Sequence, residues 1–128
     1  MKIILIEDEA NIANLIKFNL ERRGESVVVA PDAELGLKLI QEQKPDLILL
    51  DIMLPGMNGF EACLKIKNDR VLKQIPVFML TALTQSKDIE KSFECGADDY
   101  ITKPFLIREL WYTVGEKYKK FKAGTNKS

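Results

Sequence analysis

The sequence has no histidine and only two cysteines, which narrows the chemistry available to it. Cys63 and Cys95 lie far apart in the chain, without the C-x-x-C pairing that marks many zinc and redox sites. The usual zinc centres and dithiol motifs are therefore excluded. We expect both cysteines to be small buried hydrophobic residues of a cytoplasmic protein.

Long apolar runs and an excess of one charge are also missing. The longest apolar runs, such as 3–6 and 47–50, fall well short of the roughly 18 residues that a membrane span needs. Glu7 and Asp8 come too early for a signal peptide. Basic and acidic residues number 19 each, so no overall field attracts nucleic acid or an anionic membrane. We therefore expect neither direct nucleic-acid binding nor membrane attachment.

What remains is the composition of a single globular domain. The 128 residues are 46% hydrophobic and 30% charged, which suits one domain with an apolar core, since compact domains cluster at about 100–150 residues. We assign residues 1–122 to this domain. Residues 123–128 carry no hydrophobic period and are expected to form a flexible C-terminal tail.

Short apolar runs alternate with amphipathic segments along the chain. The runs, typical of strands covered on both faces, are 3–6, 27–29, 47–50, 77–80 and, more weakly, 100–102. Helical spacing of apolar residues extends over 12–20, 35–40, 60–66 and 107–121. Asn58 and Ser86 are expected to cap the third and fourth helices. Five strand–helix units predict an α/β fold with a parallel five-stranded sheet and helices on both faces.

Reactive side chains follow four of the expected strands. Glu7 and Asp8 follow the first strand, Asp51 the third, Thr81 ends the fourth, and Lys103 follows the fifth. The carboxyl ends of parallel strands meet at one edge of a sheet, where such sheets bind ligands, so these groups are expected to converge. The three acids carry −3 and the lysine +1, and the resulting −2 calls for a divalent cation.

An oxygen-only ligand set favours Mg²⁺, with Mn²⁺ as a substitute. Asp8 and Asp51 would bind the cation directly and Glu7 through water. A carboxylate beside such a cation is a suitable nucleophile toward phosphorus, because the cation neutralises charge on the incoming phosphoryl group. Asp51 is the central candidate. The Lys103 ammonium and the Thr81 hydroxyl would then bind the phosphoryl oxygens.

Each of these residues also has an ordinary structural explanation. Asp51 can cap the loop after its strand, Glu7 and Asp8 can favour the start of the first helix through its dipole, and Lys103 can be solvated. Capping does not explain why three acids, a threonine and a lysine occur together at four strand ends. The joint pattern therefore favours a phosphoacceptor.

Four segments carry a family resemblance that spans about residues 2–121. They are Ile6–Glu9, Leu50–Gly59, Leu80–Ala82 and Gly96–Phe105. In these segments the chain resembles the response regulator receiver domains of two-component signalling, most of all the receivers of winged-helix transcription factors. The resemblance implies a flavodoxin-like, doubly wound (βα)5 sandwich with strand order 2-1-3-4-5, similar to the chemotaxis regulator.

The resemblance also implies a role for each residue around one phosphorylation site. The roles are phosphoacceptor (Asp51), metal ligands (Glu7, Asp8, Asp51 and the Met53 backbone carbonyl), phosphate contact (Lys103), switch pair (Thr81 and Tyr100) and a cis peptide bond (Lys103–Pro104). Such a receiver is a signalling phosphoacceptor that assists its own Mg²⁺-dependent phosphorylation and dephosphorylation, and is not classed as an enzyme.

The implied phosphoryl donor is a histidine kinase or a histidine phosphotransfer protein. Phosphorylation is expected to reshape the face of the fourth helix, fifth strand and fifth helix, to which we assign Asp99, Glu109, Trp111 and Tyr112. This face would act on a downstream protein or a fused output domain, or form a phosphorylation-dependent homodimer. Receivers of this class often dimerise through pairs of oppositely charged residues. Ile89 and Thr113 occupy positions where that class usually carries the basic residues of these pairs.

Two other functional classes share parts of the pattern. A flavodoxin-like flavin binder has the same strand order, but the acids of Glu7–Glu9 would repel the cofactor phosphate. A phosphatase that works through an aspartyl phosphate would need a general acid two residues beyond Asp51. Met53 occupies that position and cannot donate a proton. Both alternatives are therefore disfavoured.

Overall fold

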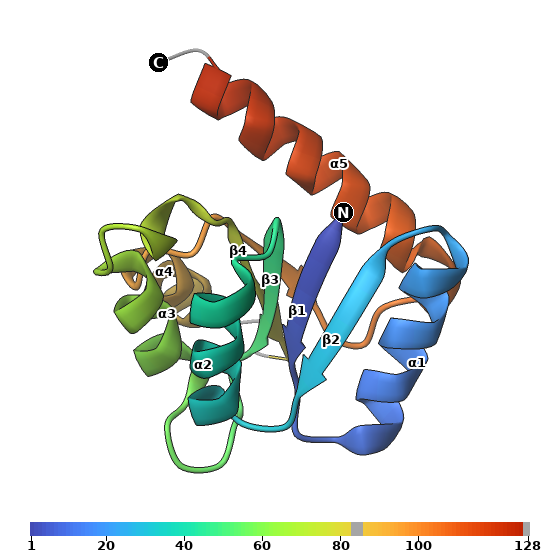
Figure 1. The fold of residues 1–128 in the computed structure, drawn as a ribbon, viewed down its shortest axis with the longest axis horizontal. Helices are drawn as coiled ribbons and strands as arrows, with labels where there is room; N and C mark the ends of the chain where they lie inside the picture. Colours follow the sequence, from blue (N-terminus) through green and yellow to red (C-terminus); the bar gives the residue numbers. More distant parts are fainter. Residues whose placement is uncertain (83–85, 127–128) are drawn as a thin grey trace.

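The computed structural model describes residues 1–82 and 86–126, which form a three-layer α/β sandwich (Figure 1). The strands are β1 (Lys2–Ile6), β2 (Ser26–Ala30), β3 (Leu47–Asp51), β4 (Val77–Thr81) and β5 (Asp99–Thr102). The helices are α1 (Ala10–Arg22), α2 (Ala33–Gln43), α3 (Gly59–Lys67), the 3₁₀ helix η1 (Leu72–Gln74), α4 (Ser86–Glu94) and α5 (Ile107–Asn126). All pairings are parallel in the order β2-β1-β3-β4-β5, which confirms the predicted fold.

The strand register aligns the carboxyl ends of the central strands. Ile6, the last residue of β1, is opposite Ala30 of β2 and Leu50 of β3. Asp51 ends β3 opposite Leu80, and Thr81 ends β4 opposite Thr102. The chain leaves β1 toward β2 on one side and later returns to β3 on the other, so a crevice opens at these carboxyl ends.

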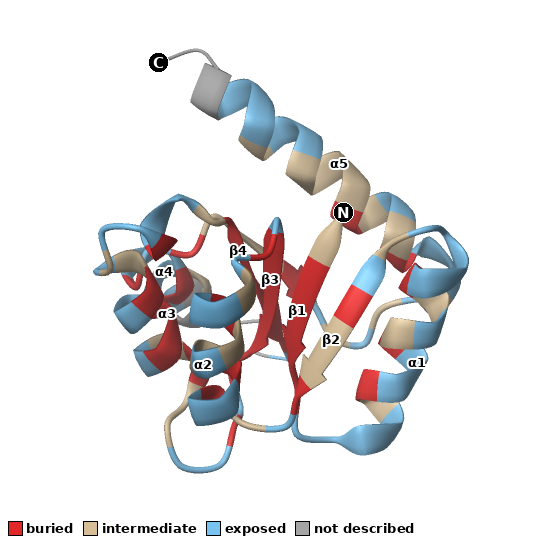
Figure 2. Ribbon diagram, in the orientation of Figure 1, coloured by how far each residue is buried: buried red, intermediate tan, exposed pale blue. Residues whose placement is uncertain are grey.

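Two apolar cores cover the two faces of the sheet, because successive strand residues point to opposite sides. Ile4, Ile6, Ile48 and Leu50 belong to the core under α2 and α3. The alternate positions Ile3, Leu5, Leu47 and Leu49 belong to the core under α1 and α5. Figure 2 shows the buried residues concentrated along β1, β3 and β4. The continuous apolar runs in the sequence reflect this burial on both faces.

Side-chain caps fix the start of two helices. Asn58 accepts a hydrogen bond from the Glu61 amide at 3.0 Å, which confirms its predicted capping role. Asp32 accepts one from the Leu35 amide at 2.8 Å and caps α2 in the same way. The predicted cap at Ser86 lies outside the part of the chain whose side chains are described.

Helix α5 ends later than its apolar period indicates. It continues to Asn126, past residue 122 where we expected the tail to begin. Packing of the period over 107–121 nucleates the helix, and each further residue then adds a backbone hydrogen bond without needing a core contact. The helix therefore includes the first four residues that we assigned to the tail. The division into a domain and a flexible tail stays a prediction.

Candidate functional site

Three acids meet at the carboxyl ends of β1 and β3. Glu7 follows β1 and its amide donates to the Ala30 carbonyl at 3.0 Å, while Asp51 is the last residue of β3. One carboxylate oxygen each from Glu7, Asp8 and Asp51 lies within 4.8 Å of the others. Glu7 and Asp51 are buried, with 1% and 5% of their surface exposed, and Asp8 is exposed. The predicted convergence of these side chains is thus present in the fold.

Lys103 reaches into this acidic cluster from the loop after β5. Its ammonium nitrogen lies 2.6 Å from Oε1 of Glu7 and 3.0 Å from Oδ2 of Asp51. The Lys103 amide donates to the Thr81 carbonyl at 2.7 Å, which ties the loop to the end of β4. The following Lys103–Pro104 peptide bond is cis. One ammonium group therefore faces two buried carboxyl groups.

The pKa values reflect an excess of negative charge. Burial, together with the neighbouring Asp51 carboxyl group, raises the pKa of Glu7 from 4.5 to about 7, even though Lys103 opposes the shift. Burial alone would lower the pKa of Lys103, but its hydrogen bonds to Glu7 and Asp51 outweigh burial and raise it. The single lysine thus does not offset the effect of burial on the Glu7 carboxyl group.

The donor set fits a hard divalent cation. Carboxylate oxygens are the ligands that such ions prefer, and the cluster supplies three of them without histidine or cysteine. Asp8, Asp51 and Met53 line an open cavity of about 370 Å³ beside Lys103, so an ion and its waters have room. The acidic cluster is therefore consistent with a divalent metal site.

Both oxygens of the Asp51 carboxyl group are held in place. Oδ1 accepts a hydrogen bond from the Met53 amide at 3.0 Å, and Oδ2 accepts the one from Lys103. The backbone behind Asp51 is packed against Gly59, whose amide donates to the Ile52 carbonyl at 2.9 Å. A Cβ atom at residue 59 would lie only 2.6 Å from the Ile52 Cα atom. The start of α3 therefore fixes the position from which Asp51 projects.

Thr81 and Tyr100 lie on the same face of the sheet. Tyr100 is opposite Met79 and Thr81 is opposite Thr102, so strand alternation points both side chains toward the side covered by α3 and α4. Thr81 is buried, and Tyr100 is partly buried. The Tyr100 ring packs edge-on against Phe93 at 5.9 Å between ring centres. This arrangement allows the two residues to influence each other through the packing of one layer.

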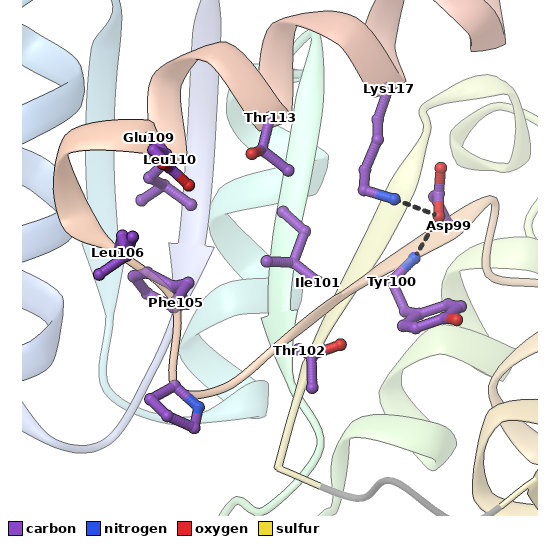
Figure 3. Close-up of a pocket in the computed structure, with 11 residues that line it drawn as sticks. Asp99, Tyr100, Ile101, Thr102, Phe105, Leu106, Glu109, Leu110, Thr113 and Lys117 are labelled. Carbon is purple, nitrogen blue, oxygen red and sulfur yellow. Dashed lines mark hydrogen bonds and ion pairs between the residues drawn. The ribbon is translucent and has the colours of Figure 1, made fainter.

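A second hollow lies between β5 and α5 (Figure 3). Asp99 and Glu109, both assigned to the output face, line it together with Thr113. Lys117 extends from α5 to Asp99, with 3.0 Å between Nζ and Oδ1, and also lies 5.6 Å from the centre of the Tyr100 ring. We did not predict this role for Lys117. The four-residue spacing of 109, 113 and 117 on one helix face was the signal available in the sequence.

Trp111 does not line that hollow, and its assignment to the output face stays a prediction. Its indole nitrogen donates to Oε2 of Glu25 at 2.8 Å, and the Arg23 guanidinium sits 5.2 Å from its ring centre. Two residues on a helix turn the side chain by about 200°, so Trp111 faces the side of α1 when Glu109 faces β5. Tyr112 is 64% exposed and does not line the hollow.

Comparison with known proteins finds a matching family model and similar proteins of known name. A family model for the response regulator receiver domain matches residues 3–114. The chain is 44% identical over 109 residues to the alkaline phosphatase synthesis transcriptional regulatory protein PhoP of Bacillus subtilis (strain 168), and equally identical to the DNA-binding dual master transcriptional regulator RpaA of Synechocystis. Each match covers 85% of this chain and 45% of the relative, so the chain spans less than half of either protein.

A solved structure agrees with the sequence relatives. The chemotaxis response regulator CheY4 of Vibrio cholerae superimposes with a TM-score of 0.86 at 27% identity. The match covers 91% of this chain and 97% of that protein. The similarity in fold therefore extends over about nine-tenths of the chain.

Proposed function

The chain belongs to the response regulator receiver domains, and from that membership we propose that Asp51 itself takes up the phosphoryl group. Such a domain is a signalling phosphoacceptor of a two-component system and not a classical enzyme. Its phosphoacceptor site is the acidic pocket of Glu7, Asp8 and Asp51. The observation that supports Asp51 is its position: it ends the central strand β3, with both carboxylate oxygens held.

The metal of this site is Mg²⁺ in our proposal, with Mn²⁺ as a substitute. Asp8, Asp51 and the Met53 backbone carbonyl would hold it directly, and Glu7 would bind it through water. When bound, the cation neutralises charge on the phosphoryl oxygens. The arrangement of the acids supports the assignment, because Glu7, Asp8 and Asp51 bring three carboxylate oxygens within 4.8 Å of one another.

The residues around Asp51 supply the rest of the chemistry. An Asp51 carboxylate oxygen attacks phosphorus while the bond from phosphorus to the donor's histidine nitrogen breaks, and an acyl phosphate forms. Lys103, which already contacts Oδ2 of Asp51, then turns its ammonium to the new phosphoryl oxygens. The Thr81 hydroxyl donates a hydrogen bond to one of these phosphoryl oxygens. Ordered donors at this point stabilise the charge that the acyl phosphate brings.

Thr81 and Tyr100 transmit the modification to the face of α4, β5 and α5. Movement of Thr81 toward the phosphoryl group makes room for Tyr100, which contacts Phe93 and lies beside the Asp99–Lys117 ion pair. Coupling of this kind is typically about 1–3 kcal/mol. It is sufficient to change the affinity of a partner for this face.

The receiver family implies a histidine kinase as a partner, and the relatives are transcription regulators. A histidine phosphotransfer protein is the alternative donor. The domain acts on a downstream protein or on a fused output domain. A phosphorylation-dependent homodimer is one way to do so, and Lys117 offers a basic group for its interface.

In the described part of the chain, no helix is both long and apolar enough to cross a bilayer. We place the receiver, residues 1–122, in the cytoplasm.

The test is phosphorylation by a small donor. The protein is incubated with Mg²⁺ and acetyl phosphate, and intact mass is followed with and without hydroxylamine, which cleaves acyl phosphates. The wild type should gain one phosphoryl group that hydroxylamine removes, and Asp51→Asn should gain none. Asp32→Asn is the matched control, because Asp32 lies at the same edge and asparagine still caps a helix. Equal labelling of Asp51→Asn and wild type would refute the assignment.

A further inference from the structure

The segment that follows α4 is packed directly onto α3. Gly96 has a positive φ of 95°, and a Cβ atom there would lie 2.8 Å from the Lys67 Cγ atom on α3. Two residues later, Asp98 forms an ion pair with Lys67 at 2.8 Å between Oδ2 and Nζ. One turn earlier, the Lys91 ammonium lies 4.7 Å from the centre of the Phe60 ring. The chain around residue 95 is thus held against α3 on both sides.

These contacts bring the two cysteines of the chain together. Cys63, on α3, is fully buried, and Cys95, immediately after α4, is 4% exposed. The Cys63 thiol donates a hydrogen bond to the Cys95 carbonyl oxygen at 3.4 Å. Both thiols are free, and the Cys95 thiol donates to the Ser92 carbonyl at 2.9 Å. Residues far apart in sequence therefore form an adjacent dithiol.

The two thiols are chemically unequal. The hydrogen bond from Cys63 lowers the pKa of Cys95 to about 7 against the effect of burial, with the Ala97 amide and Lys91 contributing in the same direction. The same hydrogen bond, together with burial, raises the pKa of Cys63. Thiolates are the reactive form of cysteine. Cys95 is also the less deeply buried of the two residues, so we assign the first reaction to Cys95 and the second to Cys63.

We propose that Cys63 and Cys95 form an oxidation site, which closes to an intramolecular disulfide on reaction with a hydroperoxide. The Cys95 thiolate attacks one peroxide oxygen, the O–O bond breaks, and hydroxide leaves and takes up a proton to become water. The Cys63 sulfur then attacks the resulting sulfenic acid, and the Cys63 proton and the sulfenic hydroxyl leave as a second water. The two thiols are oxidised by two electrons and the peroxide is reduced.

Burial selects this outcome over others. Burial keeps a bulky disulfide such as oxidised glutathione from both thiols, and it protects a sulfenic acid on Cys95 from a second protein molecule. Neither cysteine belongs to the acidic pocket, so the proposal goes beyond the phosphoacceptor function and can fail independently of it. A disulfide would join α3 to the end of α4, two residues from Phe93, which packs on Tyr100.

The experiment maps the cysteines after peroxide treatment. Reduced protein is exposed to hydrogen peroxide and analysed by intact mass and by non-reducing peptide mapping. The wild type should lose about 2 Da and yield a Cys63–Cys95 linked peptide that dithiothreitol separates. Cys63→Ala should stop at a sulfenic acid on Cys95 that a 1,3-dione traps, and Cys95→Ala should stay unmodified over the same time.

Three results in the wild type would overturn the proposal: unmodified thiols, a disulfide between two molecules, or sulfinic acid without a link between Cys63 and Cys95. The wild-type mapping decides the question even where a variant folds poorly. Labelling of Asp51 by acetyl phosphate checks each variant for a native site. A second readout is the urea midpoint, which should be higher in the oxidised protein because the disulfide closes a loop. A lower urea midpoint in the oxidised protein would contradict the proposal that the two cysteines are already positioned for a disulfide.

Discussion

Replacement of Gly59 by alanine tests whether the start of α3 positions Asp51. The new methyl group would clash with the Asp51 carbonyl oxygen and lie 2.6 Å from the Ile52 Cα atom, whereas ordinary van der Waals contact begins at 3.4 Å. Both neighbours are backbone atoms, so no side chain can rotate away. Relief requires α3 to move away from the end of β3, and the Asp51 carboxyl group moves with it.

The magnitude follows from two opposing terms. Alanine is favoured over glycine in a helix by about 0.5–1 kcal/mol, and less at the first helical residue, where Gly59 lies. Overpacking of a rigid site costs roughly 1–3 kcal/mol. We therefore expect the free energy of unfolding to fall by about 1–2 kcal/mol. A displacement approaching 1 Å at a reacting group can slow a reaction about 100-fold, so labelling of Asp51 should slow by about 10- to 100-fold.

Stability is measured by urea unfolding, monitored by circular dichroism. Reactivity is measured as the rate at which acetyl phosphate labels Asp51. Gly115→Ala is the matched control, because Gly115 lies in α5 with nothing within 4 Å of its added Cβ atom. That variant should gain about 0.5–1 kcal/mol and label normally. The reasoning would be refuted by a Gly59→Ala protein that is as stable as Gly115→Ala and labels at the wild-type rate.

Three further changes test other parts of the molecule. Without divalent metal, stability should fall by roughly 2–3 kcal/mol between about pH 4.5 and pH 7, because the folded state raises the pKa of Glu7 from 4.5 to about 7 and holds its proton more tightly than the unfolded chain. Urea titrations of wild type and Glu7→Gln check this, and an unchanged slope in the variant contradicts it. Asn58→Ala should cost about 1 kcal/mol through the lost cap of α3, whereas Asn58→Asp should stay near wild type. Trp111→Phe should cost about 1 kcal/mol, since Glu25 loses a partly buried hydrogen bond, and unaltered thermal unfolding would exclude that contact.

The fold was predictable because local signals agree with the global arrangement. Continuous apolar runs mark strands covered on both faces, and the strand-end rule places Glu7, Asp8 and Asp51 at one edge without reference to structure. Individual roles within that edge, such as those of Thr81 and Tyr100, came from the family resemblance and remain predictions.

Other features depend on which neighbour a side chain meets, and periodicity does not contain that information. The helical period shows that α5 buries one face, but Trp111 is placed by Arg23 and Glu25 from the turn after α1. Lys117 finds Asp99 only because β5 runs beneath α5. The proximity of Cys63 and Cys95 likewise requires the close approach of the segment after α4 to α3, which no spacing in the sequence reveals.

The Asp99–Lys117 ion pair has a consequence for the behaviour of the domain at high concentration. β5 is a border strand of the sheet, and a border strand offers unpaired backbone groups to which a strand of another molecule can add. A lysine from α5 reaching the first residue of this strand places a cation over that border. Lysine at a border strand disfavours edge-to-edge pairing with another molecule, so we expect the loss of Lys117 to make self-association at high concentration easier.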